Sequence, residues 1–189
     1  QQHDYLIDDL KLNVRVVGLA NSKKLAFDEE GIDLADWKAA LADPDDNCIL
    51  PAQTAEVIAD RNLRNSVFVD VTANADVVEM YSPLLKRSVS VIACNKVAAS
   101  SDLKKYSALK ALAREYNANF LFETNVGAGL PVISTLNDLI RSGDNVNRID
   151  AVLSGTLNFV FNHYDGTRPF AEVVRQAQDE GYTEPDPRL

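Results

Sequence analysis

Cysteine, histidine and methionine are scarce in this chain of 189 residues, which contains two, two and one of them. Cys48 and Cys94 show no CxxC spacing, and together with two isolated histidines they exclude a disulfide framework and argue against a structural zinc site. So few cysteines favour a reducing compartment, and we expect a cytoplasmic protein. Residues 1–5 contain neither a basic region nor an apolar core, so they predict no secretory signal.

Long apolar runs and basic clusters are also absent. No stretch approaches the roughly 18 consecutive apolar residues of a membrane span, so we expect no membrane insertion. With 19 basic against 28 acidic side chains the net charge is −9. Such a chain lacks the basic face that nucleic acids and anionic membranes require. The remaining composition, 46% hydrophobic and 25% charged, is that of an ordinary globular protein of one or at most two domains.

Short apolar runs alternate with segments of helical periodicity along the whole chain. Strands are predicted at residues 12–20, 66–71, 88–93, 119–124 and 146–153, and helices at 34–41, from 51, at 77–85 with a break at Pro83, and at 101–116, 131–142, 156–164 and 170–180. This alternation predicts an α/β fold with a Rossmann-like, mostly parallel sheet. Because such sheets bind ligands at the carboxyl ends of their strands, the loops after residues 20, 71, 93 and 124 are the candidate sites.

The first two candidate loops are polar. Asn21, Ser22 and Lys23 offer no carboxylate for the ribose of NAD, whereas the lysine would suit the extra phosphate of NADP. Taken alone, this loop has a simpler explanation as a solvated polar turn. The loop at residues 70–76 has small side chains that would let a flat cofactor approach the backbone, or it is merely the start of a helix capped by Asn74.

The next two loops carry sharper signals. Lys96 follows a predicted strand, where an ammonium group can bind phosphate or donate a proton, although most loop lysines are only solvated. Residues 123–131 hold two glycines but match neither a Walker loop nor GxGxxG. Backbone carbonyls here, together with Glu123, could hold a hard cation, and a plain glycine-rich turn is the alternative.

Two later segments complete the set. Residues 153–158 end a predicted strand and open a helix, so their hydroxyls and amides could bind a carboxylate. Residues 181–188 gather polar and charged side chains in a loop stiffened by two prolines. A solvated loop between helices is the simpler explanation of this second segment.

The order of these motifs resembles that of homoserine dehydrogenases. The resemblance rests on Asn95-Lys96, ETNVGAGLPVI at 123–133, SGTLN at 154–158 and GYTEPDPR at 181–188. Residues 17–37 are similar to the dehydrogenase part of bifunctional aspartokinase–homoserine dehydrogenases. The resemblance implies reversible reduction of L-aspartate 4-semialdehyde to L-homoserine, in threonine, methionine and isoleucine biosynthesis. It also implies NADP, or alternatively NAD, as cofactor, a monovalent cation such as sodium, a homo-oligomer, and an aspartokinase domain as a candidate fusion partner.

The resemblance also implies roles for individual residues. Lys96 and Glu184 would be catalytic, with the lysine next to the developing alkoxide and the carboxylate paired with the substrate ammonium group. The implied cofactor-binding set is Asn21, Ser22, Lys23, Thr72, Lys96 and Gly181. The implied substrate-binding set is Gly155, Thr156, Tyr182 and Glu184, and the implied cation-binding set, acting largely through backbone oxygens, is Glu123, Val126, Ala128 and Leu130.

The family pattern extends past both ends of this sequence. A glycine-rich turn would precede Leu12, and a segment with a catalytic aspartate and lysine would follow Leu189. We therefore expect a piece truncated at both ends and inactive alone: residues 1–142 as a partial NAD(P)-binding domain without its first βα unit, and residues 143–189 as the start of an α/β substrate and dimerisation domain. Two other interpretations stay open, a catalytically silent α/β binding or interaction module and another NAD(P)-dependent dehydrogenase.

Overall fold

The computed structural model describes residues 2–42 and 51–183. In chain order its elements are α1 (His3–Asp8), β1 (Gly18–Ala20), β2 (Leu25–Phe27), the 3-10 helix η1 (Leu34–Asp36), α2 (Trp37–Ala40), α3 (Pro51–Arg61), β3 (Val67–Asp70), α4 (Ala75–Val78), α5 (Tyr81–Lys86), β4 (Ser90–Ala93), α6 (Val97–Ser100), α7 (Leu103–Glu115), β5 (Phe120–Leu121), the 3-10 helix η2 (Glu123–Asn125), α8 (Val132–Arg141), α9 (Gly155–His163) and α10 (Phe170–Asp179). No helix in these ranges is both long and apolar enough to cross a membrane.

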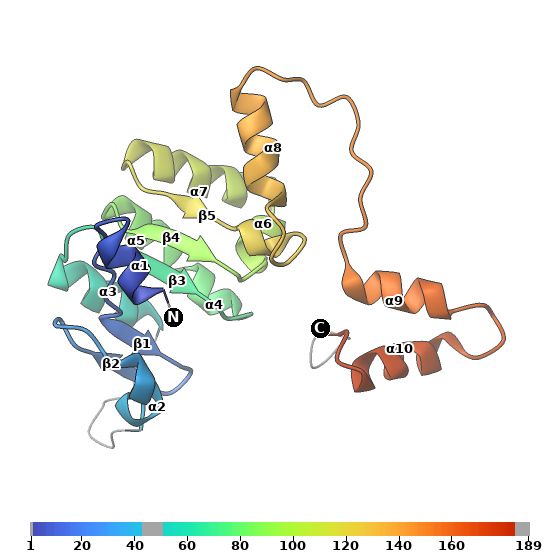
Figure 1. The fold of residues 1–189 in the computed structure, drawn as a ribbon, viewed down its shortest axis with the longest axis horizontal. Coiled ribbons are helices and arrows are strands. Elements are labelled where there is room, and N and C mark those ends of the chain that lie inside the picture. Colours follow the sequence, from blue (N-terminus) through green and yellow to red (C-terminus); the bar gives the residue numbers. More distant parts are fainter. Residues whose placement is uncertain (1, 43–50, 184–189) are drawn as a thin grey trace.

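A parallel sheet of β3, β4 and β5, in that order, forms the centre of the fold (Figure 1). Asp70 and Ala93, the last residues of β3 and β4, lie opposite each other in the register. The loops that follow these strands therefore leave the sheet at the same edge. The predicted α/β fold and three of the predicted strands are confirmed, although each strand is shorter than its apolar run.

The main core lies between this sheet and its crossover helices. Tyr81, Leu84, Leu85 and Val91 are fully buried in it. The predicted stripe of apolar residues at 77–85 forms two helices, but the break comes between α4 and α5, before Pro83. Pro83 then falls in the first turn of α5, where a missing backbone N–H has no partner to lose.

A two-stranded antiparallel hairpin, β1 and β2, precedes the sheet. The predicted buried strand at residues 12–20 is wrong for most of its length, since only Gly18–Ala20 is strand and Leu12 and Val14 are 51% and 60% exposed. An apolar run becomes a strand only where a neighbour supplies hydrogen bonds. Here β2 supplies them for three residues, so the loop after Ala20 is a hairpin turn and not a loop of the parallel sheet.

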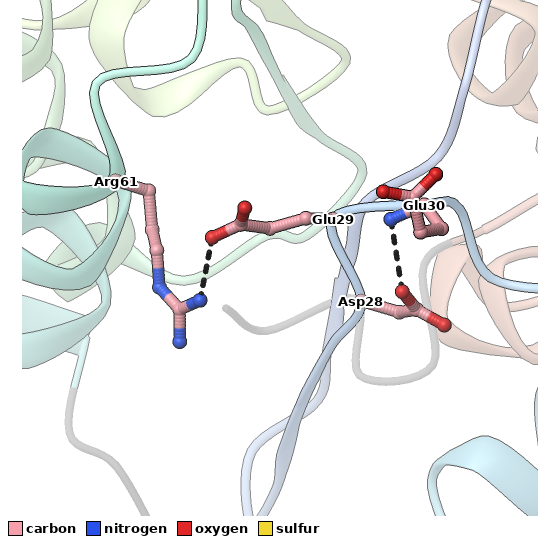
Figure 2. Close-up of polar contacts among 4 residues, drawn as sticks. All are labelled: Asp28, Glu29, Glu30 and Arg61. Carbon is pink, nitrogen blue, oxygen red and sulfur yellow. Dashed lines mark hydrogen bonds and ion pairs between the residues drawn. The ribbon is translucent and has the colours of Figure 1, made fainter.

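Arg61, the last residue of α3, connects that helix to the segment after β2. Its Nη1 donates a 2.7 Å bond to Oε1 of Glu29 (Figure 2). Its guanidinium also lies 4.6 Å from the ring centre of Phe27. The same loop is held by Asp28, whose Oδ1 accepts from the backbone N–H of Glu30 at 2.9 Å. These contacts attach the hairpin to the helix by polar and cation–π interactions.

The helices α7 and α8 follow their sequence signals closely. Asp102 caps α7 by accepting a 2.7 Å bond from the backbone N–H of Lys104, close to the predicted start of this helix. Gly143 follows α8 with a φ of +90°, a left-handed conformation that ends helices readily at glycine.

Residues 144–154 form neither helix nor strand, so the predicted strand at 146–153 is wrong. Ile149, Val152 and Leu153 are all exposed here, and no neighbouring strand pairs with them in the described ranges. Beyond this segment α9 and α10 pack on each other around Phe159 and Val173, apart from the sheet in Figure 1. The expected domain boundary after residue 142 stays a prediction.

Candidate functional site

The carboxyl edge of the sheet contains a buried polar cluster built around Asp70. This residue is 1% exposed and ends β3. Its Oδ2 accepts bonds from the Tyr81 hydroxyl at 2.6 Å and from Nδ2 of Asn95 at 3.0 Å, while its Oδ1 accepts from the backbone N–H of Thr72 at 2.7 Å. Three donors thus compensate the removal of this carboxyl group from water.

Tyr81 serves this cluster as a neutral donor. Burial, followed by the hydrogen bond to Asp70, raises the pKa of Tyr81 far above its ordinary value. Its ring also packs against Phe68 and Phe120 in the core. These contacts make Tyr81 a structural support of the edge.

Asn95 connects the loops that leave this edge. It is 1% exposed, and its Nδ2 lies 3.0 Å from the backbone oxygen of Asn74 and 3.4 Å from Oγ1 of Thr72. Its Oδ1 accepts a 3.1 Å bond from the backbone N–H of Val97, the first residue of α6. The sequence contains one signal for this role, a polar side chain two residues after a predicted strand, but it predicts no function for Asn95 or Asp70.

The predicted cofactor residues Thr72 and Lys96 lie on the two loops that Asn95 joins. Both residues are exposed, and Lys96 immediately precedes α6. The alternative prediction for the first of these loops is also met, because Asn74 caps α4 by accepting from the backbone N–H of Asp76 at 2.7 Å. Cys94, beside Asn95, is a half-buried free cysteine.

The loop that follows β5, residues 123–131, is ordered around the start of α8. The Glu123 carboxylate accepts bonds from the backbone N–H groups of Ile133 at 2.8 Å and Ser134 at 2.7 Å, so it caps this helix. Asn125 links the loop to the cluster by donating a 3.3 Å bond from Nδ2 to the backbone oxygen of Asn95. The Glu123 side chain is thereby occupied within the protein.

The backbone of this loop turns sharply where the cation was predicted. Gly127 has a φ of +71° and Ala128 a φ of +52°, which is unusual for a residue with a Cβ. Within the described ranges, the carbonyl oxygens of Val126 and Ala128 accept no hydrogen bond. Within the described residues, these backbone oxygens and the buried, unpartnered Oδ1 of Asn125 are therefore the groups left to coordinate a cation, and the Glu123 carboxylate is not.

The predicted substrate residues meet at the start of α9 and the end of α10. Ser154 caps α9 by accepting a 3.1 Å bond from the backbone N–H of Leu157, and the Thr156 hydroxyl donates to the backbone oxygen of Tyr182. The Tyr182 ring stacks on Phe159 with 4.3 Å between ring centres. Gly155, Thr156, Gly181 and Tyr182 are thus brought together, whereas Glu184 lies outside the described residues.

Two predicted sets are not brought to the sheet edge. Asn21 folds the β1–β2 hairpin turn, since its Oδ1 accepts from the backbone N–H groups of Lys23 at 2.8 Å and Lys24 at 2.9 Å, while Ser22 and Lys23 are exposed. The α9–α10 residues stand apart from the sheet (Figure 1). The structure therefore assembles one group of candidates around Asn95 and a second around Thr156.

No group of three or more His, Cys, Asp or Glu side chains that could hold a metal ion occurs in the part of the chain that the structure describes. A cavity of about 380 Å³ lies at the opposite edge of the sheet, lined by the ends of α3 and α5 with Arg64 and Arg87. Helix carboxyl ends attract cationic side chains, so these arginines are accounted for without a ligand.

Two family models match the chain. Residues 2–123 match the homoserine dehydrogenase NAD binding domain, and residues 131–189 match homoserine dehydrogenase. The bifunctional aspartokinase/homoserine dehydrogenase 1 of Arabidopsis thaliana is 40% identical over 183 residues, covering 97% of this chain and 20% of that protein. The homoserine dehydrogenase of Emericella nidulans is 41% identical over 165 residues, covering 83% of this chain and 45% of that protein.

Solved structures show the same fold. A Candida auris protein of unknown function matches with a TM-score of 0.77 and 32% identity, over 97% of this chain and 53% of that one. A hyperthermophilic archaeal homoserine dehydrogenase in complex with NADPH matches with a TM-score of 0.76 and 24% identity, over 98% of this chain and 58% of that one. The chain thus spans between a fifth and three fifths of these proteins. By the model match over residues 2–123, this chain belongs to the homoserine dehydrogenase family.

Proposed function

We propose that the protein carrying this chain catalyses the reversible NADP-dependent reduction of L-aspartate 4-semialdehyde to L-homoserine. The observation that carries this proposal is the match of both family models, which together cover residues 2–123 and 131–189. The structure supports it because Thr72 and Lys96, two residues expected at the cofactor, lie on adjacent loops at the carboxyl edge of the sheet.

Lys96 is proposed to stabilise the oxygen of the reacting group. The cofactor would supply a hydride to the aldehyde carbon, which leaves negative charge on the oxygen. An ammonium group at the start of α6 can donate a hydrogen bond to that oxygen and neutralise its charge. Thr72, an exposed residue whose backbone N–H is held by Asp70, would border the cofactor.

The preference for NADP over NAD is also a proposal. The archaeal relative of known structure was solved with NADPH, and Lys23 gives this chain an exposed cation on the β1–β2 turn. Asn21 and Ser22 are proposed as its polar neighbours at the cofactor. An acidic residue, which would favour the free ribose hydroxyl of NAD, is missing from residues 21–24.

A monovalent cation such as sodium is proposed for the loop after η2. Support comes from the unpaired carbonyl oxygens of Val126 and Ala128, and from Oδ1 of Asn125, a buried atom with no hydrogen-bond partner in the described part of the chain. The backbone oxygens of Glu123 and Leu130 would complete the set. Neutral oxygen ligands suit a cation of low charge, because no carboxylate has to be neutralised.

The amino-acid substrate is proposed to bind at the start of α9. Thr156 and Gly155 would present the hydroxyl and first-turn amides of that helix, and Tyr182 is fixed beside them by its stack on Phe159. Gly181 is proposed to contact the cofactor. Glu184 is proposed to pair with the substrate ammonium group.

The assembly and the compartment of the intact protein are also proposals. The names of the Arabidopsis and Haemophilus influenzae relatives describe aspartokinase fusions, so we propose such a fusion as one form of the intact protein. A homo-oligomer is proposed from the exposed apolar side chains of residues 149–161. A reducing compartment such as the cytoplasm is proposed because Cys94 is a free thiol, although the plant relatives are named chloroplastic.

The deciding experiment uses the full-length protein that the gene encodes. It follows the oxidation of NADPH with aspartate semialdehyde as substrate. We expect turnover with this aldehyde, and a loss of about 100-fold or more in kcat for Lys96→Met. Lys104→Met, on the exposed start of α7, is the matched control and should keep wild-type kcat. Binding of NADPH without turnover of the aldehyde would favour another NAD(P)-dependent dehydrogenase, and neither binding nor turnover would favour a silent α/β module.

A further inference from the structure

A single buried side chain connects all three strand ends at the candidate cofactor edge. Asn95 follows β4, yet its Nδ2 reaches Asp70 at the end of β3 and the backbone oxygen of Asn74 in the loop beyond it. On the other side, the backbone oxygen of Asn95 accepts from Asn125, which follows β5. The partners lie 21 to 30 residues away in sequence, so these bonds are tertiary.

The same residue also fixes the position of Lys96. Its Oδ1 holds the backbone N–H of Val97 at 3.1 Å, and the peptide of Lys96 lies between these two groups. Lys96 itself is exposed and immediately precedes α6. The Asn95 side chain therefore holds the peptide from which the lysine side chain leaves the backbone.

We propose that Asn95 is a positioning residue for the cofactor reaction. Its amide holds the Thr72 loop against the turn that carries Lys96, so that both residues face one ligand in a fixed relative geometry. This inference rests on the proposed function, because Thr72 and Lys96 border a cofactor only in that proposal. A buried, fully bonded amide is suited to this task, since any rotation would leave polar groups unpaired.

Replacement of Asn95 will also destabilise the fold, so a matched control is needed. Tyr81→Phe supplies it, because Tyr81 donates to the same Oδ2 of Asp70 but makes no hydrogen bond to Thr72, Asn74 or Val97. Asn95→Ala and Tyr81→Phe each remove one hydrogen-bond donor from the buried carboxyl group of Asp70. Only Asn95→Ala releases the Thr72 loop from the Lys96 turn.

The first measurement compares wild type, Asn95→Ala and Tyr81→Phe, each as the full-length protein, in their affinity for NADPH and in their turnover. For Asn95→Ala we expect the Kd for NADPH to rise about tenfold, which corresponds to the loss of one or two hydrogen bonds, and kcat to fall as well. Tyr81→Phe should lower the Tm by a similar amount to Asn95→Ala. Its Kd for NADPH and its kcat should nevertheless stay within about twofold of wild type. Equal effects of the two variants on Kd and kcat would overturn the positioning role.

The second measurement is amide hydrogen exchange without ligand, which separates this inference from the proposed function. Asn95→Ala should speed exchange at residues 72–76 and at Val97 beyond the change seen with Tyr81→Phe. Unchanged exchange in both segments would overturn the inference even if the enzyme is active, whereas faster exchange in a protein that binds no NADPH would leave the structural link intact and refute the proposed function.

Discussion

The hydroxyl of Tyr81 donates a 2.6 Å hydrogen bond to Oδ2 of Asp70, a carboxyl group that is 1% exposed. Eleven residues separate the two in sequence, and the contact joins the first turn of α5 to the end of β3. It attaches the end of β3 to the core, whereas Asn95 joins the loops beyond the strand ends. The two donors to the same carboxyl oxygen therefore serve different parts of the structure.

The first prediction concerns Tyr81 and alkaline pH. Folding raises the pKa of Tyr81 above its ordinary value of 10.0, so the unfolded chain loses this proton first as the pH rises. The contribution of Tyr81 to stability is complete below about pH 10 and declines above it. Tyr81→Phe should lower the free energy of unfolding by about 1–2 kcal/mol near pH 8.

Urea unfolding at several pH values measures this effect. The difference between wild type and Tyr81→Phe should shrink as the pH rises from about 10 to about 11, because only the wild type has this proton to lose. Tyr5→Phe, at an exposed tyrosine of α1, is the control and should show no such trend. A difference that stays constant with pH would contradict the assignment.

The second prediction concerns the cap of α8. Glu123→Gln keeps the shape but removes the charge that faces the first-turn amides of Ile133 and Ser134. We expect a loss of about 1–2 kcal/mol in the free energy of unfolding. Asp138→Asn is the control on the same helix: its side chain is 74% exposed, and its pair with Arg141 should contribute less than about 0.5 kcal/mol. Chemical denaturation measures the free energy of unfolding of both variants. Equal losses would show that the Glu123 cap stabilises the protein no more than the exposed ion pair does.

The third prediction concerns the two glycines of the loop at 123–131. Gly127 has a positive φ, and an added Cβ would lie 2.9 Å from Cγ2 of Val132. Gly127→Ala should therefore lower stability by about 1–3 kcal/mol. Gly129→Ala is the matched control, because a Cβ there meets nothing within 4 Å. Thermal unfolding of both variants checks the difference, and a stable Gly127→Ala would show that the loop adopts another backbone path.

The fourth prediction concerns the ion pair between Arg61 and Glu29 (Figure 2). Both side chains are about half exposed, so water and salt weaken their attraction. A double-mutant cycle with Arg61→Met and Glu29→Gln should give a coupling of about 0.5–1 kcal/mol that decreases at high salt. Arg61→Met should also lose the contact with Phe27 and so exceed the effect of Glu29→Gln. The reverse order would contradict the role given to the Phe27 ring.

The fifth prediction tests the choice of cofactor. Lys23→Glu should raise the KM for NADPH by about tenfold while changing the KM for NADH by less than about twofold, because only NADPH carries the additional phosphate. Lys11→Glu, at an exposed lysine outside the hairpin turn, is the control for the change in net charge. An equal rise for both cofactors would refute the role proposed for Lys23.

The sequence predicted much of the fold because its local signals are strong. The predicted cap at Asn74 acts within a few residues and falls where expected. The cap at Asp102 and the positive φ of Gly143 and Gly181 mark helix ends by equally local interactions. The two predictions that failed, strands at 12–20 and 146–153, depended on a partner strand elsewhere. An apolar run indicates that a segment tends to be buried, but it forms a strand only where a neighbouring strand pairs with it.

In the candidate site, too, some features could be predicted from local sequence signals and others depended on tertiary contacts. The sequence by itself determined the family, the parallel α/β sheet and the loops that carry Thr72, Lys96 and Glu123, because motifs and periodicity are local properties of the chain. Only the tertiary structure decided that Asp70, Tyr81 and Asn95 form one buried cluster, and that the Glu123 carboxylate caps α8. These contacts join residues 10 to 25 positions apart, and a buried polar group takes whichever partner the packed fold brings within hydrogen-bond distance.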